Sequence, residues 1–118
     1  MTKVKLTIIT QNQKSREKAD HLSDLIQSTL DINVSPIIEK YFKFDNSYKI
    51  SFDLSSYTQL NLNNNFIEFT DRICSPWVLR YHKNTKNIEL FYIKKDSSQI
   101  RKNEFNVICC ANFEIENE

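Results

Sequence analysis

Few residues in this chain have the types and spacing that catalysis requires. The two histidines, His21 and His82, are too far apart in sequence to form a local ligand pair. His82 could act as a general base only if the fold brought it an orienting acid and a nucleophile such as Cys74 or Ser75. Nothing in the local sequence indicates such a group. An enzyme that uses His82 is therefore our third hypothesis, and we expect a protein with neither catalytic activity nor a small-molecule substrate.

The three cysteines also lack a pattern that binds metal. Neighbouring residues of a strand point to opposite faces, so we expect Cys109 and Cys110 to share neither a metal ion nor a disulfide. Free cysteine is among the most buried residue types, which predicts reduced, buried thiols in a cytoplasmic protein. No Cys-x-x-Cys, His-x-x-x-His or Asp-x-Asp spacing occurs, and we expect neither a metal nor another cofactor.

The composition excludes several ligand classes. The chain has 118 residues, no glycine and a formal net charge of +1. Glycine-rich phosphate loops are excluded, because the backbone must approach the ligand closely or adopt positive φ there. A net charge near zero offers no basic field for nucleic acid. No run of about 18 apolar residues could span a membrane, and the N-terminus lacks the apolar region of a signal peptide.

Because the chain has no glycine, we expect asparagine to occupy the turn positions that need positive φ. The candidates are Asn46, Asn64, Asn84 and Asn87.

The clearest structural signal is a hairpin over residues 75–96, with a polar turn at residues 83–86. One register sets Arg80 opposite Glu89 on one face and Leu79 opposite Leu90 on the other. The same register pairs Trp77 with Tyr92, Tyr81 with Ile88 and Val78 with Phe91. Because apolar pairs occur on both faces, we expect this hairpin to lie inside the sheet, with its turn and His82 free.

Six further elements follow from hydrophobic periodicity. Alternating apolar residues predict strands over residues 3–10, 37–44, 48–54 and 105–115, and apolar stripes of helical period predict helices over residues 13–30 and 66–73. We expect Asn12 to cap the first helix. A three-residue turn at residues 45–47 would join the second hairpin and pair Phe42 with Ile50 and Ile38 with Leu54.

The predicted order is β-α-β-β-α-β-β-β, in one α+β domain over residues 1–118. Both helices should cover one face of a largely antiparallel sheet. The first six elements match a ferredoxin-like, split βαβ arrangement extended by two strands, and a strongly curved sheet wrapped around the first helix is the alternative. The opposite face should be open to water.

The absence of a catalytic or ligand cluster favours protein binding as the function. Tyrosine and arginine carry binding energy at protein interfaces, and carboxylates complement a cationic partner. On these grounds the candidate contacts are Tyr41, Asp53, Tyr57, Arg80, Tyr81, His82, Glu89 and Glu114.

In overall character the chain resembles the immunity proteins of bacterial polymorphic toxin systems, particularly those of contact-dependent growth inhibition. The likeness lies in a short chain rich in Asn, Lys and Ile, in an α+β domain with many Tyr and Phe residues, and in polar sheet faces such as Lys49, Ser51, Asp53 and Ser55. It implies a cytoplasmic protein that neutralises a cognate toxin domain, by plugging its active site or covering a remote surface.

A ferredoxin-like RNA- or small-ligand-binding module is the alternative. The aromatic residues between Tyr41 and Phe52 could stack on bases, beside Lys40, Lys43 and Lys49. The alternation of the predicted strands buries most of these rings, which favours core packing over base stacking.

Overall fold

The chain folds around one antiparallel sheet of six strands. The structure is a computed structural model, and it describes residues 2–56 and 65–117. The strand order is β2-β3-β1-β8-β6-β5, with every neighbouring pair antiparallel. The strands are β1 (Thr2–Thr10), β2 (Ile37–Lys40), β3 (Tyr48–Asp53), β5 (Val78–His82), β6 (Asn87–Ile93) and β8 (Ile108–Asn117). A separate pair joins β4 (Cys74–Ser75) to β7 (Gln99–Ile100), and a 3-10 helix (Asn103–Val107) precedes β8.

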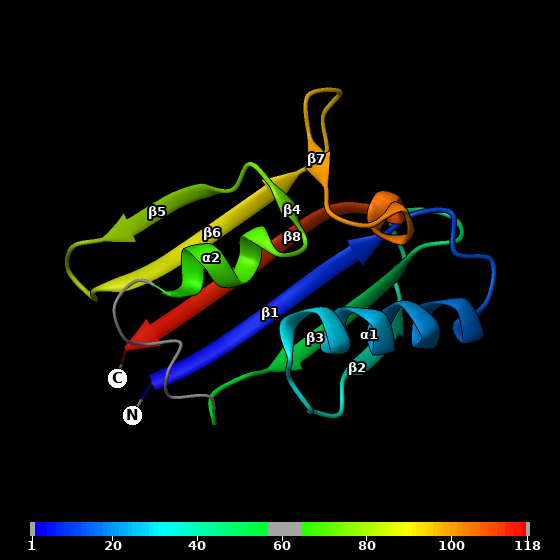
Figure 1. Ribbon diagram of the computed structural model, residues 1–118. Coiled ribbons are helices and arrows are strands. Elements are labelled where there is room, and N and C mark those ends of the chain that lie inside the picture. The colour runs from blue at the N-terminus through cyan, green and yellow to red at the C-terminus, as the bar shows by residue number, and fades with distance from the viewer. Residues whose placement is uncertain (1, 57–64, 118) are drawn as a thin grey trace.

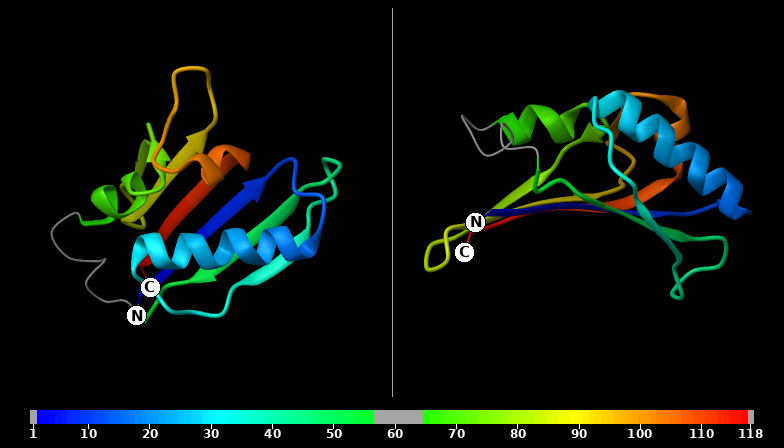
Figure 2. Two further views of the ribbon diagram at one scale, coloured as in Figure 1. Left: turned by 45° about the vertical axis from the view of Figure 1, so that its right-hand side comes forward. Right: turned by 90° about the horizontal axis from the view of Figure 1, so that it is seen from below.

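Both helices, α1 (Arg16–Leu30) and α2 (Asn65–Asp71), lie against the same face of the sheet, and the other face carries no helix among the described residues (Figures 1 and 2). The predicted α+β class, with a largely antiparallel sheet and two helices on one face, is therefore confirmed. The core lies between the helices and the sheet. It contains alternate residues of β1 (Val4, Leu6, Ile8) and the apolar stripe of α1 (Ala19, Leu22, Ile26, Leu30).

The ferredoxin-like expectation holds for only half of the sheet. The split βαβ unit is present, because β3 lies between β1 and β2. On its other side β1 pairs with β8, the last strand, whereas the ferredoxin-like arrangement would place there the strand that follows the second helix. The hairpin of β5 and β6 is therefore displaced to the outside of the sheet.

The register predicted for that hairpin is confirmed, but its predicted position is wrong. Arg80 pairs with Glu89, and Leu79 with Leu90. The strand β5 nevertheless forms the edge of the sheet, and Val78 and Leu79 are 62% and 50% exposed. A local register depends only on the pairing of two adjacent strands, so it carries no information about what lies on either side of them.

The predicted register of the second hairpin is wrong. Ile38 pairs with Ile50 rather than with Leu54, and residues 41–47 form a seven-residue loop. The start of β3 is fixed instead by the end of β1, because Ser47 Oγ donates to the Thr10 carbonyl and Tyr48 N donates to Thr10 Oγ1 over 3.2 Å. Phe42 and Phe44 therefore lie in the loop, where Phe42 is 87% exposed.

The boundaries of α1 differ from the prediction at its beginning. The helix starts at Arg16, where the hydroxyl of Ser15 accepts the Lys18 N–H over 3.3 Å as the N-cap. Asn12 has φ 60 and does not cap the helix. Positive φ also occurs at Asp31, Asn46 and Lys86, so of the asparagines expected there Asn46 is confirmed, Asn84 and Asn87 are not, and Asn64 lies outside the described residues.

The last strand begins later than predicted and contains a β-bulge. Residues 103–107 form the 3-10 helix, which buries Phe105 completely. Where β8 meets the end of β1, Ile9 pairs with Cys110 but Thr10 pairs with Ile108. Cys109 is thus an extra residue without a register partner on β1. This shift is the reason that Ile108, which breaks the alternation in the sequence, is buried.

Candidate protein-binding face

The face of the sheet opposite the helices gathers most of the predicted contact residues, and we call it the open face (Figure 2, right). Since Val4, Leu6 and Ile8 point into the core, the alternate residues of β1 and their register partners lie on the open face. One row of register partners crosses five strands at the centre of the open face. It consists of Asp53, Lys5, Glu114, Glu89 and Arg80, in that order.

Two carboxylates stand next to each other in this row. Glu114 on β8 pairs directly with Glu89 on β6. Like charges directly opposite each other on neighbouring strands destabilise a sheet. Both residues are half-buried, and Glu116, two residues along β8, adds a third carboxylate on the same face. The open face therefore brings three carboxylates together on two neighbouring strands.

Cationic and aromatic groups border the acidic pair on the side of β5. The Nε2 atom of His82 lies 2.7 Å from Oε1 of Glu89. The guanidinium carbon of Arg80 lies 5.2 Å from the centre of the Phe91 ring, a cation–π contact between the neighbouring strands β5 and β6. On the other side, Lys5 pairs in register with both Asp53 and Glu114.

The environment of the carboxylates changes their pKa values in opposite directions. Burial raises the pKa of Glu114, and the negative charges of Glu89 and Glu116 raise it further, against a smaller opposing effect of Lys5. The pKa of Asp53 is lowered, chiefly because the Ser55 hydroxyl donates to Asp53 Oδ1 over 2.7 Å. Asp53 is thus held ionised by its own neighbour, whereas at Glu114 burial and the neighbouring carboxylates outweigh the stabilisation of the charged form.

Apolar side chains flank the charged centre of the open face. Ile37 on β2, Val78 on β5 and Ile93 on β6 are 63%, 62% and 64% exposed. A groove of about 480 Å³ runs beside β1, and it is lined by Lys3, Val4, Lys5, Ile37, Asp53, Ser55, Glu114 and Glu116. A polar centre between exposed aliphatic groups has the mixed character of surfaces that bind proteins.

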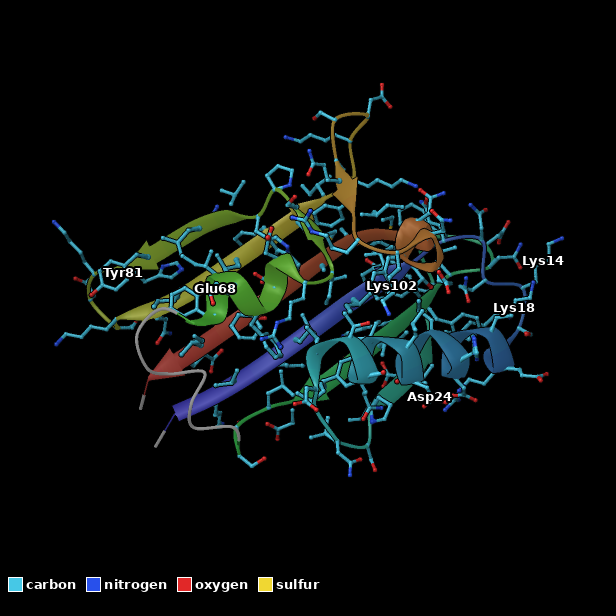
Figure 3. The ribbon with its side chains drawn as sticks, viewed as in Figure 1. Lys14, Lys18, Asp24, Glu68, Tyr81 and Lys102 are labelled. Carbon is cyan, nitrogen blue, oxygen red and sulfur yellow. The ribbon has the colours of Figure 1, made fainter. Side chains whose placement is uncertain are left out.

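The structure brings five of the eight predicted contact residues together on this face: Asp53, Arg80, His82, Glu89 and Glu114. Tyr81 points to the helix side at the turn end of β5 and is 52% exposed (Figure 3). Tyr41 lies in the loop of residues 41–47, where its ring contacts Phe42 and Phe44. Tyr57 lies outside the described residues.

The predicted set omitted Lys5, Asn112 and Ile93, which belong to the same face. Lys5 became part of it only because β1 lies between β3 and β8. The Asn112 side chain donates from Nδ2 to Glu114 Oε1 over 2.9 Å and so positions that carboxylate. The alternation of Lys3, Lys5 and Thr7 with apolar residues could have shown that Lys5 lies on a polar face of the sheet. It could not have shown which strands lie beside β1.

The structure also bears on the other chemistry considered from the sequence. His82 has an acidic partner in Glu89, but Cys74 and Ser75 pair with β7 beyond the opposite end of β5 and are not placed beside it. Within residues 2–56 and 65–117, no three or more His, Cys, Asp or Glu side chains are grouped to hold a metal ion. No helix in the described part of the chain is both long and apolar enough to cross a membrane.

Comparison of the chain with protein-family models, with curated proteins and with solved structures found no match in any of the three.

Proposed function

We propose that this protein binds another protein through its open face, and that the surface it covers is cationic. The observation that carries the proposal is the direct pairing of Glu89 with Glu114. Two half-buried carboxylates in cross-strand contact oppose folding, and local conflicts of this kind are expected where a protein keeps residues for binding. A lysine or arginine of a partner, placed between them, would convert the repulsion into two charge-assisted hydrogen bonds.

The surroundings of the carboxylates support the same proposal. The exposed aliphatic groups of Ile37, Val78 and Ile93 offer apolar area on both sides of the acidic centre. Arg80 is already held in position by Phe91, so less conformational entropy is lost when it contacts a partner. The six strands give the face a rigid base.

We further propose that the partner is the toxin domain of a bacterial polymorphic toxin system and that the chain is its cytoplasmic immunity protein. Toxin domains that act on nucleic acids or anionic substrates carry cationic active-site surfaces, which could supply the charge that complements Glu89 and Glu114. The chain would then act as a stoichiometric inhibitor.

Co-expression with the toxin domain encoded immediately upstream, followed by affinity capture, tests this function. We expect a tight complex, and we expect its affinity to fall at least about tenfold when Glu89→Gln and Glu114→Gln are introduced together. The matched control is Glu68→Gln, which removes an exposed carboxylate from α2 on the helix side (Figure 3) and should leave the affinity unchanged.

Two results would reject the proposal. One is that no product of an adjacent gene binds the chain tightly. The other is that the control substitution weakens the complex as much as the open-face pair, because the contact would then lie elsewhere. The association rate should also decrease as salt is added, since steering by exposed charges is screened.

A second candidate rests on the loop of residues 41–47. Phe42 and Phe44 are exposed there, beside the exposed residues Lys40 and Lys43, and their rings could stack on the bases of single-stranded RNA. Titration of a labelled oligonucleotide at low salt tests this function, with Phe42→Ala as the variant. Absence of binding by the unmodified chain would dismiss it.

A further inference from the structure

The β-bulge between β1 and β8 places two thiols together that an ordinary strand would separate. Side chains of adjacent residues in a regular strand point to opposite faces. Because Cys109 is the extra residue of the bulge, its Sγ lies 4.0 Å from Sγ of Cys110. The sequence-based premise that these two side chains point to opposite faces is therefore wrong, and both thiols are free.

The hydrogen bonds around the two sulfurs make them inequivalent. The thiol of Cys109 donates, with Sγ 3.3 Å from the carbonyl oxygen of Ile9 and directed also at the Cys110 sulfur. Cys110 accepts from Cys109. Both residues are partly exposed to solvent, whereas Cys74 is buried. Cys110 pairs in register with Ile9 and Ile93, at one end of the open face.

The effect of this arrangement on ionisation supports a difference in reactivity. The Cys109 thiol, by donating to Cys110, lowers the pKa of Cys110, and the pKa of Cys109 is raised in turn. Burial raises the pKa of the third cysteine, Cys74, to about 12. Since the thiolate is the reactive form, Cys110 is the sulfur most available for attack at neutral pH.

We propose that Cys109 and Cys110 form a reactive dithiol that exchanges with small disulfides of the glutathione class, with Cys110 as the attacking sulfur and Cys109 as the resolving sulfur. Reactive cysteines of redox-sensitive proteins are accessible and lie beside a second, resolving cysteine, and the bulge supplies that arrangement here. The proposal concerns the isolated chain and does not depend on what the open face binds.

Oxidation of the pair takes two thiol–disulfide exchange steps. The Cys110 thiolate attacks one sulfur of oxidised glutathione, so that a Cys110–glutathione disulfide forms and one glutathione thiolate leaves. Cys109 then loses its proton and attacks the Cys110 sulfur, which closes a Cys109–Cys110 disulfide and releases the second glutathione thiolate. Two electrons pass from the protein to oxidised glutathione, which is reduced to two molecules of glutathione.

The product should be easily reduced. Neighbouring Cα atoms are about 3.8 Å apart across a trans peptide, which is shorter than the separation that unstrained disulfides adopt. Strained disulfides are the labile ones. We therefore expect dithiothreitol at low concentration to restore both thiols.

Intact-mass measurement of the chain after incubation with oxidised glutathione tests the proposal. In a Cys74→Ser background, the unmodified pair should lose the mass of two hydrogen atoms. Cys109→Ser should stop at the mixed disulfide and gain one glutathionyl group. Cys110→Ser should react at least about tenfold more slowly, because the remaining thiol has a raised pKa.

Peptide mapping of the unsubstituted chain keeps the test decisive even if a serine variant fails to fold. The first glutathionyl group is expected on Cys110, and tandem mass spectra of the C-terminal peptide distinguish it from Cys109. First modification at Cys109 or Cys74 would overturn the assignment of the nucleophile. Accumulation of the mixed disulfide in the unsubstituted chain, without loss of two hydrogens, would overturn the resolving role of Cys109.

Discussion

Glu114 is a residue of the open face whose negative charge destabilises the folded state. It lies half-buried between Lys5 and Glu89, and Lys5 and the hydrogen bond from Asn112 compensate its charge only in part. A carboxyl group whose pKa is raised on folding binds its proton more tightly in the folded state than in the unfolded state. Its contribution to stability is therefore present at low pH and is lost as the pH rises through the raised pKa.

Replacement of this carboxylate should stabilise the protein at neutral pH. We expect Glu114→Gln to raise the free energy of unfolding by about 0.2–1 kcal/mol at pH 7, the range for cross-strand charge pairs at sites that solvent partly screens. The gain should disappear below the ordinary glutamate value of 4.5, where Glu114 of the unsubstituted chain is protonated. Urea denaturation at both pH values measures it, with Glu68→Gln as the control; a gain that persists at low pH would contradict the electrostatic origin.

Trp77 joins the hairpin to the small sheet through two contacts. Its ring lies 5.7 Å from that of Tyr92, and its Nε1 donates to the Cys74 carbonyl over 2.6 Å. We expect Trp77→Ala to destabilise the protein by about 2–3 kcal/mol, less than for a fully buried tryptophan because the ring is half-buried. The neighbouring Val78→Ala, at an exposed position, should change stability by no more than about 0.5 kcal/mol. Equal effects of the two substitutions in chemical denaturation would refute this.

Contacts between individual residues show why some parts of the fold could be predicted from the sequence and others could not. The register of β5 with β6 could be predicted because charged and apolar pairs all agreed on it. The second hairpin could not, since Thr10 fixes its register through Ser47 and Tyr48 from a strand that is distant in sequence. The candidate contact residues were chosen by type, but the meeting of five of them on one face depends on the strand order. The pairing of Cys109 with Cys110 depends on a bulge that no local pattern indicates.

At the scale of elements, the absence of glycine is most evident where α1 ends. Asp31 adopts φ 56, and the next residue, Ile32, donates its N–H to the Gln27 carbonyl over 3.0 Å. Helices commonly end in this way with glycine. Here the position carries both a Cβ atom in the left-handed region and a negative charge at the negative end of the helix dipole.

Substitutions at Asp31 should separate the destabilising effect of its charge from that of its left-handed backbone conformation. We expect Asp31→Asn to raise the unfolding free energy by about 0.3–1 kcal/mol by removing the charge, and Asp31→Gly to add a further few tenths of a kcal/mol by relieving the backbone. Thermal and urea unfolding of the two variants measure the increments. If neither variant is more stable than the unsubstituted chain, the end of α1 is not strained in the way we describe.

The position of β5 at the edge of the sheet is a second feature at the scale of elements. Val78, Leu79 and Tyr81 remain exposed on a strand whose outer side has no partner strand in the described structure. Arg80 and His82 alternate with them, and charged residues on an edge strand oppose pairing with further strands. The same two residues thus border the proposed binding site and limit aggregation.

At the scale of the whole molecule, the sheet is organised around two strands from opposite parts of the chain. β1 and β8 lie side by side at the centre of the sheet, and their ends, Thr2 and Asn117, pair with each other (Figure 1). The hydrogen bond from Cys109 to Ile9 joins residues 100 positions apart. Each half of the sheet, β2-β3-β1 and β6-β5, reaches the other only through β8.

This arrangement has a consequence for the time course of folding. Contacts between distant segments form slowly, because the entropy of closing a long loop is lost before the contact compensates it. A ribosome would synthesise both hairpins and both helices before the strand that unites them. During that interval β1 and β6 would each present an unpaired edge, a state in which a chaperone could bind.

We therefore expect refolding from urea, followed by Trp77 fluorescence, to take milliseconds to seconds rather than microseconds. A chain shortened after Val107 should lack cooperative unfolding altogether, because neither half of the sheet can cover its side of the core without β8. Cooperative thermal unfolding of that shortened chain would mean that one half is an independent folding unit. β8 would otherwise be the strand that allows the elements before it to reach their native state.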